Sequence, residues 1–162
     1  MTNRNLSGDM MMDIRRLVNQ FRNAIDVAKD AGEFDKDFAF YKFPRGCCGD
    51  TCDLLAQFLL ENGIRTYYFC GTYRDGSFEN VQSHAWLLTD NQTILDITGD
   101  QFKDNPHFLN YDKSVYVGVE DDFHRLFEVE DRDVHENFGL DALGSMCQPR
   151  LNGLYRKIIK YI

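Results

Sequence analysis

The order of sequence patterns between residues 43 and 102 limits the folds that this chain can adopt. A glycine-containing turn comes first, an apolar helix pattern follows it, and strand patterns come after the helix. The turn (FPRGCCGD, 43–50) precedes an apolar run that ends at Asn62-Gly63, a strong helix exit. Acidic or hydroxyl side chains at 50, 51 and 53 suit the first turn of a helix. This pattern predicts that Cys48 lies at or just before the N-terminus of a helix.

Strand patterns follow this helix. The β-branched and aromatic run 64–70 predicts one strand, and Arg74-Asp75-Gly76-Ser77 predicts a turn after it. The runs 84–88 and 93–97 flank the short polar connection Asp90-Asn91, which favours an antiparallel hairpin. A fourth strand is predicted at 114–119, where valines alternate with other residues.

Helix patterns occupy both ends of the chain. Apolar residues at 9–31 recur at spacings of three and four, and Gly32 supplies a stop. The face opposite is polar, which is typical of a solvated surface, and we assign it no function; it carries Arg15, Arg16, Asn19, Arg22, Asn23 and Asp26. A second amphipathic helix is predicted at 151–162, whereas 33–46 reads as irregular and the charged segment 120–144 only partly suggests a helix.

These patterns predict an α+β fold in which N-terminal helices pack on an antiparallel β-sheet. The 162 residues fit one domain, 1–162, that can bury a core without disulfides or metal. With 43% apolar residues, 13 Phe and 8 Tyr, the chain has the composition of a packed globule with an aromatic-rich core.

The net charge and the cysteine content limit the binding partners and the cellular compartment that we expect for this protein. The net charge of −8 disfavours nucleic acid, because such binding comes mostly from Lys and Arg at phosphates. We find no signal-type segment and no apolar run long enough for a membrane span, so we expect a cytoplasmic protein with no membrane partner. The odd set of five cysteines is then expected to consist mostly of free thiols.

The predicted helix start provides a setting for thiol chemistry. A cysteine there faces unpaired backbone N–H groups and the positive end of the helix dipole, which favour the thiolate and can also bind an oxyanion. We prefer Cys48 as the nucleophile. Cys47 remains an alternative, because a helix that began one residue earlier would place its sulfur in the reactive position.

His84 and Asp96 complete a possible catalytic triad. A histidine that faces a cysteine can accept the thiol proton, and an acidic partner holds the required tautomer. Asp96 stands in an apolar strand, where a carboxylate is costly unless it is paired. Because 84 and 96 fall on the two predicted hairpin strands, the three side chains can meet at one end of the sheet.

The other candidate residues receive weaker interpretations. We expect Cys52, one helical turn after Cys48, to pack beneath the nucleophile, and we interpret Cys70 and Cys147 as inert, buried apolar residues. The remaining histidines lie in segments without a second chemical partner and are interpreted as surface or local structural residues; they are His107, His124 and His135. Gln82 or Gln101 can supply a side-chain oxyanion donor, but the sequence does not fix where either points.

Residues 43–102, with GCCGD at 46–50, SHAW at 83–86 and DIT at 96–98, resemble the core of the papain-like and transglutaminase-like thiol superfamily. Arylamine N-acetyltransferases and leader-peptide proteases are similar in the same way. The resemblance implies a papain-like core with Cys48 as nucleophile, His84 as base and Asp96 as orienting residue. We carry over neither the coenzyme A site nor the calcium sites of these families, and we expect no cofactor and no metal.

The sequence therefore predicts a thiol hydrolase or acyltransferase that forms a thioester with a peptide, protein or small amide substrate. Resolution by water would make it a peptidase or amidase, and resolution by an amine would make it transglutaminase-like. Two other classes stay open. One is an inactive binding or immunity-like protein of the same fold. The other is a zinc-binding module that uses Cys47, Cys48, Cys52 and His84.

Overall fold

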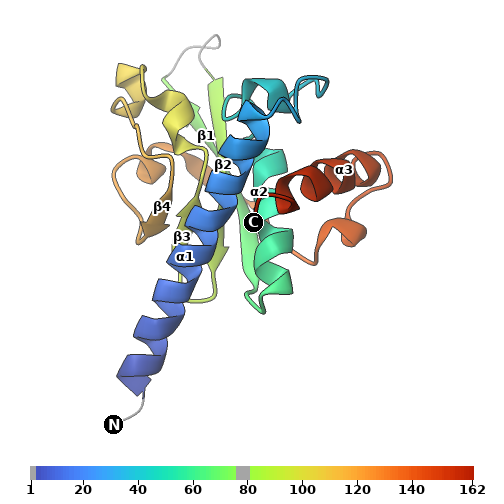
Figure 1. Cartoon of the computed structure of the whole chain (residues 1–162). Coiled ribbons are helices and arrows are strands. Elements are labelled where there is room, and N and C mark those ends of the chain that lie inside the picture. The colour runs from blue at the N-terminus through green and yellow to red at the C-terminus, as the bar shows by residue number, and fades with distance from the viewer. Residues whose placement is uncertain (1–2, 76–80) are drawn as a thin grey trace.

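The protein is described by a computed structural model, which covers residues 3–75 and 81–162, with side chains from Gly8 onward. In these ranges it has an α+β fold with three α-helices and a five-stranded antiparallel sheet, as the sequence predicts (Figure 1). The helices are α1 (Asn3–Asp30), α2 (Cys48–Glu61) and α3 (Gln148–Ile159). The strands are β1 (Thr66–Arg74), β2 (Val81–Thr89), β3 (Ile94–Asp96), β4 (Tyr116–Gly118) and β5 (Glu128–Glu136).

The sheet has the strand order β4-β3-β2-β1-β5, and each neighbouring pair is antiparallel. The predicted hairpin is β2 and β3, in which Leu87 pairs with Leu95 and Leu88 with Ile94. This register brings the end of β3, where Asp96 lies, alongside the part of β2 that carries His84. The predicted turn at 74–77 lies partly outside the described residues.

Helix α1 crosses the sheet and extends beyond it at its N-terminal end (Figure 1). The predicted apolar stripe is buried as expected; its members are Ile14, Leu17, Val18, Phe21, Ile25 and Ala28. The prediction for the opposite face was wrong at Arg22, whose residue is only 8% exposed and whose guanidinium donates to the backbone oxygens of Ile97 and Ser114. Arg22 satisfies carbonyl groups at the end of β3 and before β4, a role that helix periodicity cannot reveal.

Helix α2 begins and ends where the sequence signals lie. Its first residue is Cys48 and its last is Glu61. Gly63 adopts φ +77°, and the N–H groups of Gly63 and Ile64 donate to the carbonyls of Leu60 and Leu59, which is the pattern of a Schellman C-cap. Because a residue with a β-carbon is strained at this φ, the glycine sets the point at which the helix stops.

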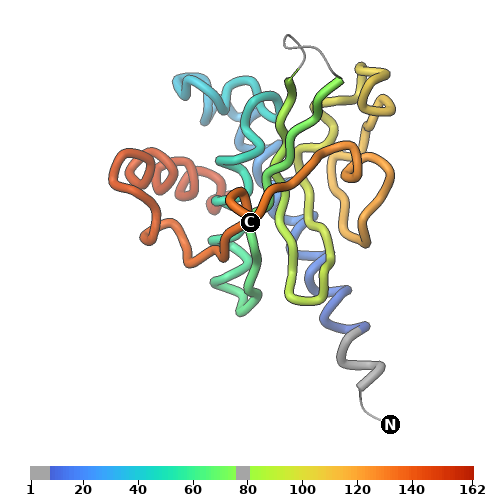
Figure 2. Tube along the Cα trace, turned by 180° about the vertical axis from the view of Figure 1, so that it is seen from behind, coloured from blue at the N-terminus to red at the C-terminus, as the bar shows by residue number. Residues whose placement is uncertain are grey.

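Strand β5 is the main element that the sequence does not predict. Its nine residues, EVEDRDVHE, are mostly charged and exposed, and it forms one edge of the sheet beside β1 (Figure 2). The pairing contains a bulge between Phe69 and Gly71. A β-carbon on Gly71 would lie 2.5 Å from Cβ of Phe127, so this approach requires glycine. Charged edge strands resist aggregation, but they hide the alternation that identifies strands from sequence.

Two apolar clusters are buried in the fold. The larger one joins the three α-helices to the sheet through residues such as Phe21, Leu55, Leu87 and Leu95. The second, which we call the aromatic cluster, consists of Trp86, Leu88, Ile94, Phe102, Phe108, Tyr111, Phe123 and Phe127. His84 packs against rings of the aromatic cluster. Among the described residues, no helix is both long and apolar enough to cross a membrane.

Candidate functional site

Cys48 is the first residue of α2 and is partly exposed. The preceding residue, Cys47, is the N-cap; its carbonyl accepts the first helical hydrogen bond, from Thr51 N at 2.8 Å. The N–H groups at the start of the helix therefore have no intrahelical partner, and Cys48 is the first residue of that turn. The structure confirms the predicted placement of this thiol at a helix N-terminus.

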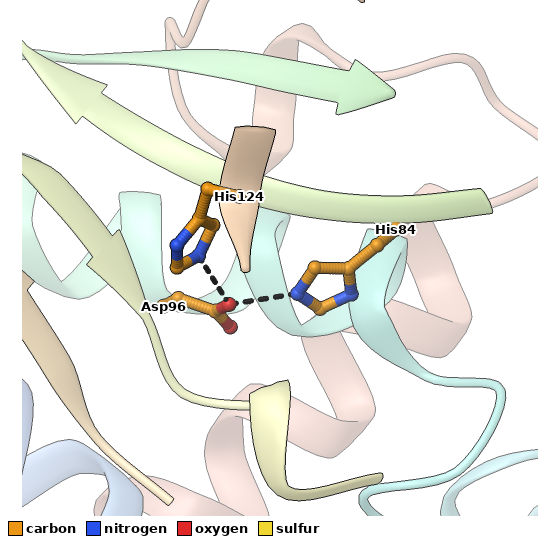
Figure 3. A group of neighbouring side chains, drawn as sticks. All are labelled: His84, Asp96 and His124. Atoms are coloured by element: carbon orange, nitrogen blue, oxygen red, sulfur yellow. Dashed lines mark hydrogen bonds and ion pairs between the residues drawn. The ribbon is translucent and has the colours of Figure 1, made fainter. Parts of the chain in front are cut away.

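His84 and Asp96 form a buried ion pair. Nε2 of His84 lies 2.7 Å from Oδ2 of Asp96, and their side chains are 0% and 1% exposed (Figure 3). Burial by itself lowers the pKa of His84, but the Asp96 charge and hydrogen bond outweigh it and raise that pKa to about 9. Burial would raise the pKa of Asp96, and the two neighbouring histidines instead hold it well below its usual range. The carboxylate is therefore ionised.

The backbone fixes the orientation of Asp96. Its Oδ1 accepts a hydrogen bond from the backbone N–H of Thr98 at 3.0 Å, two residues further along the chain. Its Oδ2 is then directed toward His84. The sequence DIT thus builds a local turn that presents one carboxylate oxygen to the imidazole, because a short aspartate side chain can bond the backbone two residues on.

The second nitrogen of His84 is available to Cys48. Nε2 of Gln101 lies 3.3 Å from Nδ1 of His84 and also donates to the carbonyl of Thr98 at 3.0 Å. An amide nitrogen is a donor, so this contact fits the neutral form of His84, with the proton on Nε2 and a lone pair on Nδ1, whereas the raised pKa favours the imidazolium, in which Nδ1 also carries a proton. In the neutral form, Nδ1 is the base that can take the thiol proton.

The environment favours the Cys48 thiolate. Burial acts to raise the pKa of this thiol, but hydrogen bonding with His84, the His84 charge and the backbone N–H of Ala85 lower it overall. The thiol and imidazole are therefore set up to exchange one proton. The structure brings Cys48, His84 and Asp96 together in the arrangement that the sequence predicts.

Cys47 has the opposite environment. Its sulfur donates to the carbonyl oxygens of Ala39 and Arg45 at 3.3 and 3.2 Å, and its residue is 1% exposed. Burial raises the pKa of this thiol to about 12, with smaller contributions from Asp50 and Cys48. Cys47 therefore stays protonated at neutral pH, and this geometry favours Cys48 over the alternative nucleophile.

The remaining cysteines differ in how deeply they are buried. Cys52 is buried, as expected, and burial raises its pKa well above the usual range. Cys70 is half-buried, and burial again raises its pKa. The prediction of a buried Cys147 was wrong, because this residue is exposed at the N-cap of α3. Cys147 lies in a loop-to-helix junction, where neighbouring polar residues give no sign of burial.

The interpretation of His124 as a residue outside this constellation was also wrong. His124 is 1% exposed, and its Nε2 lies 2.8 Å from the same Oδ2 of Asp96 that binds His84 (Figure 3). Its Nδ1 lies 2.6 Å from Oδ1 of Asp121. The one sequence signal was local: Asp121 stands three residues before His124, a spacing at which a single turn joins the two side chains. The contact with Asp96 depends on tertiary packing.

His84, Asp96 and His124 each place one potential ligand atom within 4.8 Å of the others, and among the described residues they form the single group of this kind. Both imidazoles lie within hydrogen-bonding distance of one oxygen of Asp96. Hydrogen bonds are therefore enough to explain why these three side chains lie close together. The group includes none of the cysteines. The predicted zinc ligands Cys47, Cys48, Cys52 and His84 are therefore not gathered into one site.

An ion pair anchors the segment that carries Gln101. The guanidinium of Arg22 donates to both carboxylate oxygens of Asp100, at 2.9 and 2.8 Å, and also pairs with Asp26. Asp100 and Gln101 belong to a 3-10 helix, Gly99–Phe102, that follows β3 directly. Arg22 thereby joins α1 to the segment that brings Gln101 to His84. The second glutamine candidate, Gln82, lies on the exposed beginning of β2.

A recess of about 240 Å³ lies between α2 and the end of β5. Asp53 lines it, one helical turn after Gly49, and burial raises the pKa of this carboxyl to about 6 with help from Asp50. His135, another lining residue, stacks on Tyr68, whose hydroxyl lies 3.4 Å from the position of a β-carbon on Gly49. Asp53 therefore adds a negative charge to this recess above about pH 6.

Comparisons with protein-family models, with curated proteins and with solved structures found no match to this chain.

Proposed function

We propose that this protein is a thiol hydrolase or acyltransferase of papain-like or transglutaminase-like architecture, with Cys48 as nucleophile, His84 as base and Asp96 as orienting residue. The observation that carries the proposal is the convergence of the three groups. A buried, ionised carboxylate holds one nitrogen of His84 at 2.7 Å, and the other nitrogen serves the thiol with the lowered pKa. A cysteine with a purely structural role does not need a histidine and a carboxylate arranged to transfer its proton.

In the acylation step, the thiol proton passes to Nδ1 of His84, and the sulfur attacks the carbonyl carbon of an amide or ester. A carbon–sulfur bond forms, and the electron pair of the carbonyl moves to its oxygen. When this intermediate collapses, the bond to the amine or alcohol breaks, and that leaving group takes the proton from His84. The products are a thioester on Cys48 and the free amine or alcohol.

The oxyanion of that intermediate has donors on two sides. The first-turn N–H groups of α2 lie at the thiol, and Nε2 of Gln101 lies 3.3 Å from the imidazole nitrogen that serves it. The amide of Gln101 uses one hydrogen for Thr98 and directs the second at Nδ1 of His84; once Nδ1 has taken the thiol proton it no longer accepts, and that second hydrogen is released for the oxyanion. We therefore assign Gln101, rather than Gln82, as the side-chain donor.

In the second step, water or an amine gives a proton to Nδ1 of His84 and attacks the thioester carbon. The carbon–sulfur bond breaks, the sulfur regains its proton, and an acid or an amide leaves. The substrate class that fits this chemistry is a peptide, a protein or a small amide. No cofactor takes part in either step.

The test uses 4-nitrophenyl acetate, an activated ester that needs no specific recognition. We expect a rapid release of nitrophenolate matching one acetyl group per chain, mapped to Cys48 by mass spectrometry. Cys48→Ala should abolish the burst while the melting temperature stays near that of the unmodified protein, and Cys47→Ala should retain it. Cys147, which is exposed, provides the internal control for unassisted acetylation.

Equal, slow acetylation of Cys48 and Cys147 would overturn the proposal and leave a binding protein that keeps the fold without the chemistry. A burst that survives in Cys48→Ala and disappears in Cys47→Ala would move the nucleophile to Cys47. Adding glycinamide during deacylation distinguishes the two reaction types, because an acyltransferase releases N-acetylglycinamide whereas a hydrolase releases acetate.

A further inference from the structure

His124 has a carboxylate on each side of its ring. Nδ1 lies 2.6 Å from Oδ1 of Asp121, and Nε2 lies 2.8 Å from Oδ2 of Asp96. The His124 side chain is 0% exposed, so no water competes for these two contacts. Asp121 is fixed in turn, because its Oδ1 also accepts the backbone N–H of His124 at 2.9 Å and its Oδ2 accepts the hydroxyl of Tyr111 at 3.1 Å.

This geometry determines the protonation of the ring. An ionised carboxylate offers only acceptors, so a ring nitrogen that meets one must carry a proton. Asp96 meets His84 and accepts the backbone N–H of Thr98, and Asp121 accepts the backbone N–H of His124 and the Tyr111 hydroxyl, so both carboxylates act as acceptors. Both nitrogens of His124 therefore donate, and the ring is an imidazolium cation.

Besides the two carboxylates and His84, the groups that pack against His124 are uncharged at neutral pH. The aromatic rings that pack on it are Tyr111, Tyr116, Trp86 and Phe123. Burial raises the pKa of both tyrosines, which remain neutral. The ring of His84 lies 6.3 Å away, centroid to centroid, and Arg125 is an exposed residue that pairs with Glu120 and Asp122.

We propose that His124 is a positioning residue for the Cys48–His84–Asp96 triad. As a buried cation between Asp96 and Asp121, it holds the Asp96 carboxylate against His84 and offsets part of the negative charge of that carboxylate. The inference rests on the proposed function for its catalytic meaning. It extends the triad into a chain of alternating charges that runs from the thiolate through His84, Asp96 and His124 to Asp121. Figure 3 shows the two imidazoles on either side of the shared carboxylate.

The cation has a measurable effect on His84. Asp96 alone would hold a proton on His84 to high pH, whereas a positive charge 6.3 Å away opposes that proton. Asp121 cancels part of the opposing field. Coulomb's law with an effective dielectric of about 20 then gives a net effect of about one pH unit on the titration of His84. His84 is thereby kept closer to the range in which it can both accept and return a proton.

The first experiment needs no substitution. Nitrogen-15 NMR distinguishes a doubly protonated imidazole from either neutral tautomer, and the contacts of His124 with two carboxylates lead us to expect protons on both of its nitrogens at pH 7. His107, which is exposed, provides an internal comparison in the same spectrum. A neutral His124 at pH 7 would overturn the inference.

The second experiment measures the coupling in a Cys48→Ala background, so that the thiol does not influence the titration. We expect His124→Gln, which can donate to only one carboxylate and carries no charge, to move the titration of His84 upward by about one pH unit. His107→Gln in the same background should leave it unchanged. A melting curve for each variant shows whether the fold is retained.

An unchanged titration of His84 in folded His124→Gln protein would also overturn the inference, because a purely structural histidine has no such effect. In protein that retains Cys48, we expect His124→Gln to slow acetylation of Cys48 at pH 7 by about tenfold. The reason is that the titration of His84 then lies further above the pH of the assay, so His84 is a poorer base. Absence of a burst in the unsubstituted protein would overturn the proposed function, whereas a neutral His124 overturns only the role of this residue.

Discussion

Replacing Asp96 with Asn tests the centre of the site. The substitution keeps the size of the side chain and an oxygen that accepts the Nε2–H of His84, but it removes the charge. Asp96 is the main group that raises the pKa of His84 from 6.5 to about 9 against the effect of burial. A shift of this size corresponds to about 3 kcal/mol of interaction with the imidazolium form.

Without that charge, burial dominates and His84 is neutral at pH 7. The thiolate then loses its cationic partner, and burial pushes the pKa of Cys48 back to its ordinary range or above. At pH 7 the thiolate fraction falls to about 1%, so alkylation of Cys48 should slow, by up to about 100-fold. The assay is the rate of carbamidomethylation by iodoacetamide from pH 5 to pH 10, mapped to Cys48 by mass spectrometry, with exposed Cys147 as the control.

Stability should follow the same titrations. Because the folded pKa of His84 is raised, its contribution is complete below pH 6.5 and disappears as the pH rises through about 9. Because the folded pKa of Asp96 is lowered, its contribution is complete above about pH 4 and disappears only in stronger acid. Urea unfolding should therefore show Asp96→Asn to be less stable by about 3 kcal/mol at pH 6, with a smaller difference at pH 10.

Two results would refute this reasoning. One is an alkylation profile of Cys48 that Asp96→Asn leaves unchanged, since the carboxylate would then have no influence on the thiol. The other is a stability difference that is the same at pH 6 and pH 10, which would assign to Asp96 a packing role rather than an electrostatic one.

Two further predictions concern the segment that follows β3. Arg22→Leu leaves Asp100 and two carbonyl groups without their partner, so we expect urea unfolding to show a loss of about 3 kcal/mol, whereas Arg16→Leu on the exposed face of α1 should change stability by less than about 0.5 kcal/mol. A loss no larger than that of Arg16→Leu would contradict this role. Gln101→Ala removes an oxyanion donor, so the acetylation burst should slow by about 100-fold while the pH profile of alkylation keeps its midpoint; an unaltered burst rate would exclude Gln101 from the oxyanion site.

Local patterns contained most of the helix and hairpin information. The start of α2 at Cys48 and its end before Gly63 follow from capping residues and a left-handed glycine, which act within a few residues of the chain. The buried pairing of β2 with β3 follows from short apolar runs around a polar turn. These same elements carry Cys48, His84 and Asp96, so the residues of the proposed triad could be selected from the sequence.

Tertiary packing decided what surrounds the triad. Strand β5 has a charged sequence and becomes a strand through pairing with β1 along the edge of the sheet. Arg22 and His124 carry side chains that are usually exposed, and each is buried only because the fold delivers carboxylates and carbonyls from distant segments. The 28-residue separation of His124 from Asp96 lies beyond any helical or strand period. The sequence by itself therefore determined which residues are candidates for the proposed reaction, whereas the folded chain decided which charged groups lie around them.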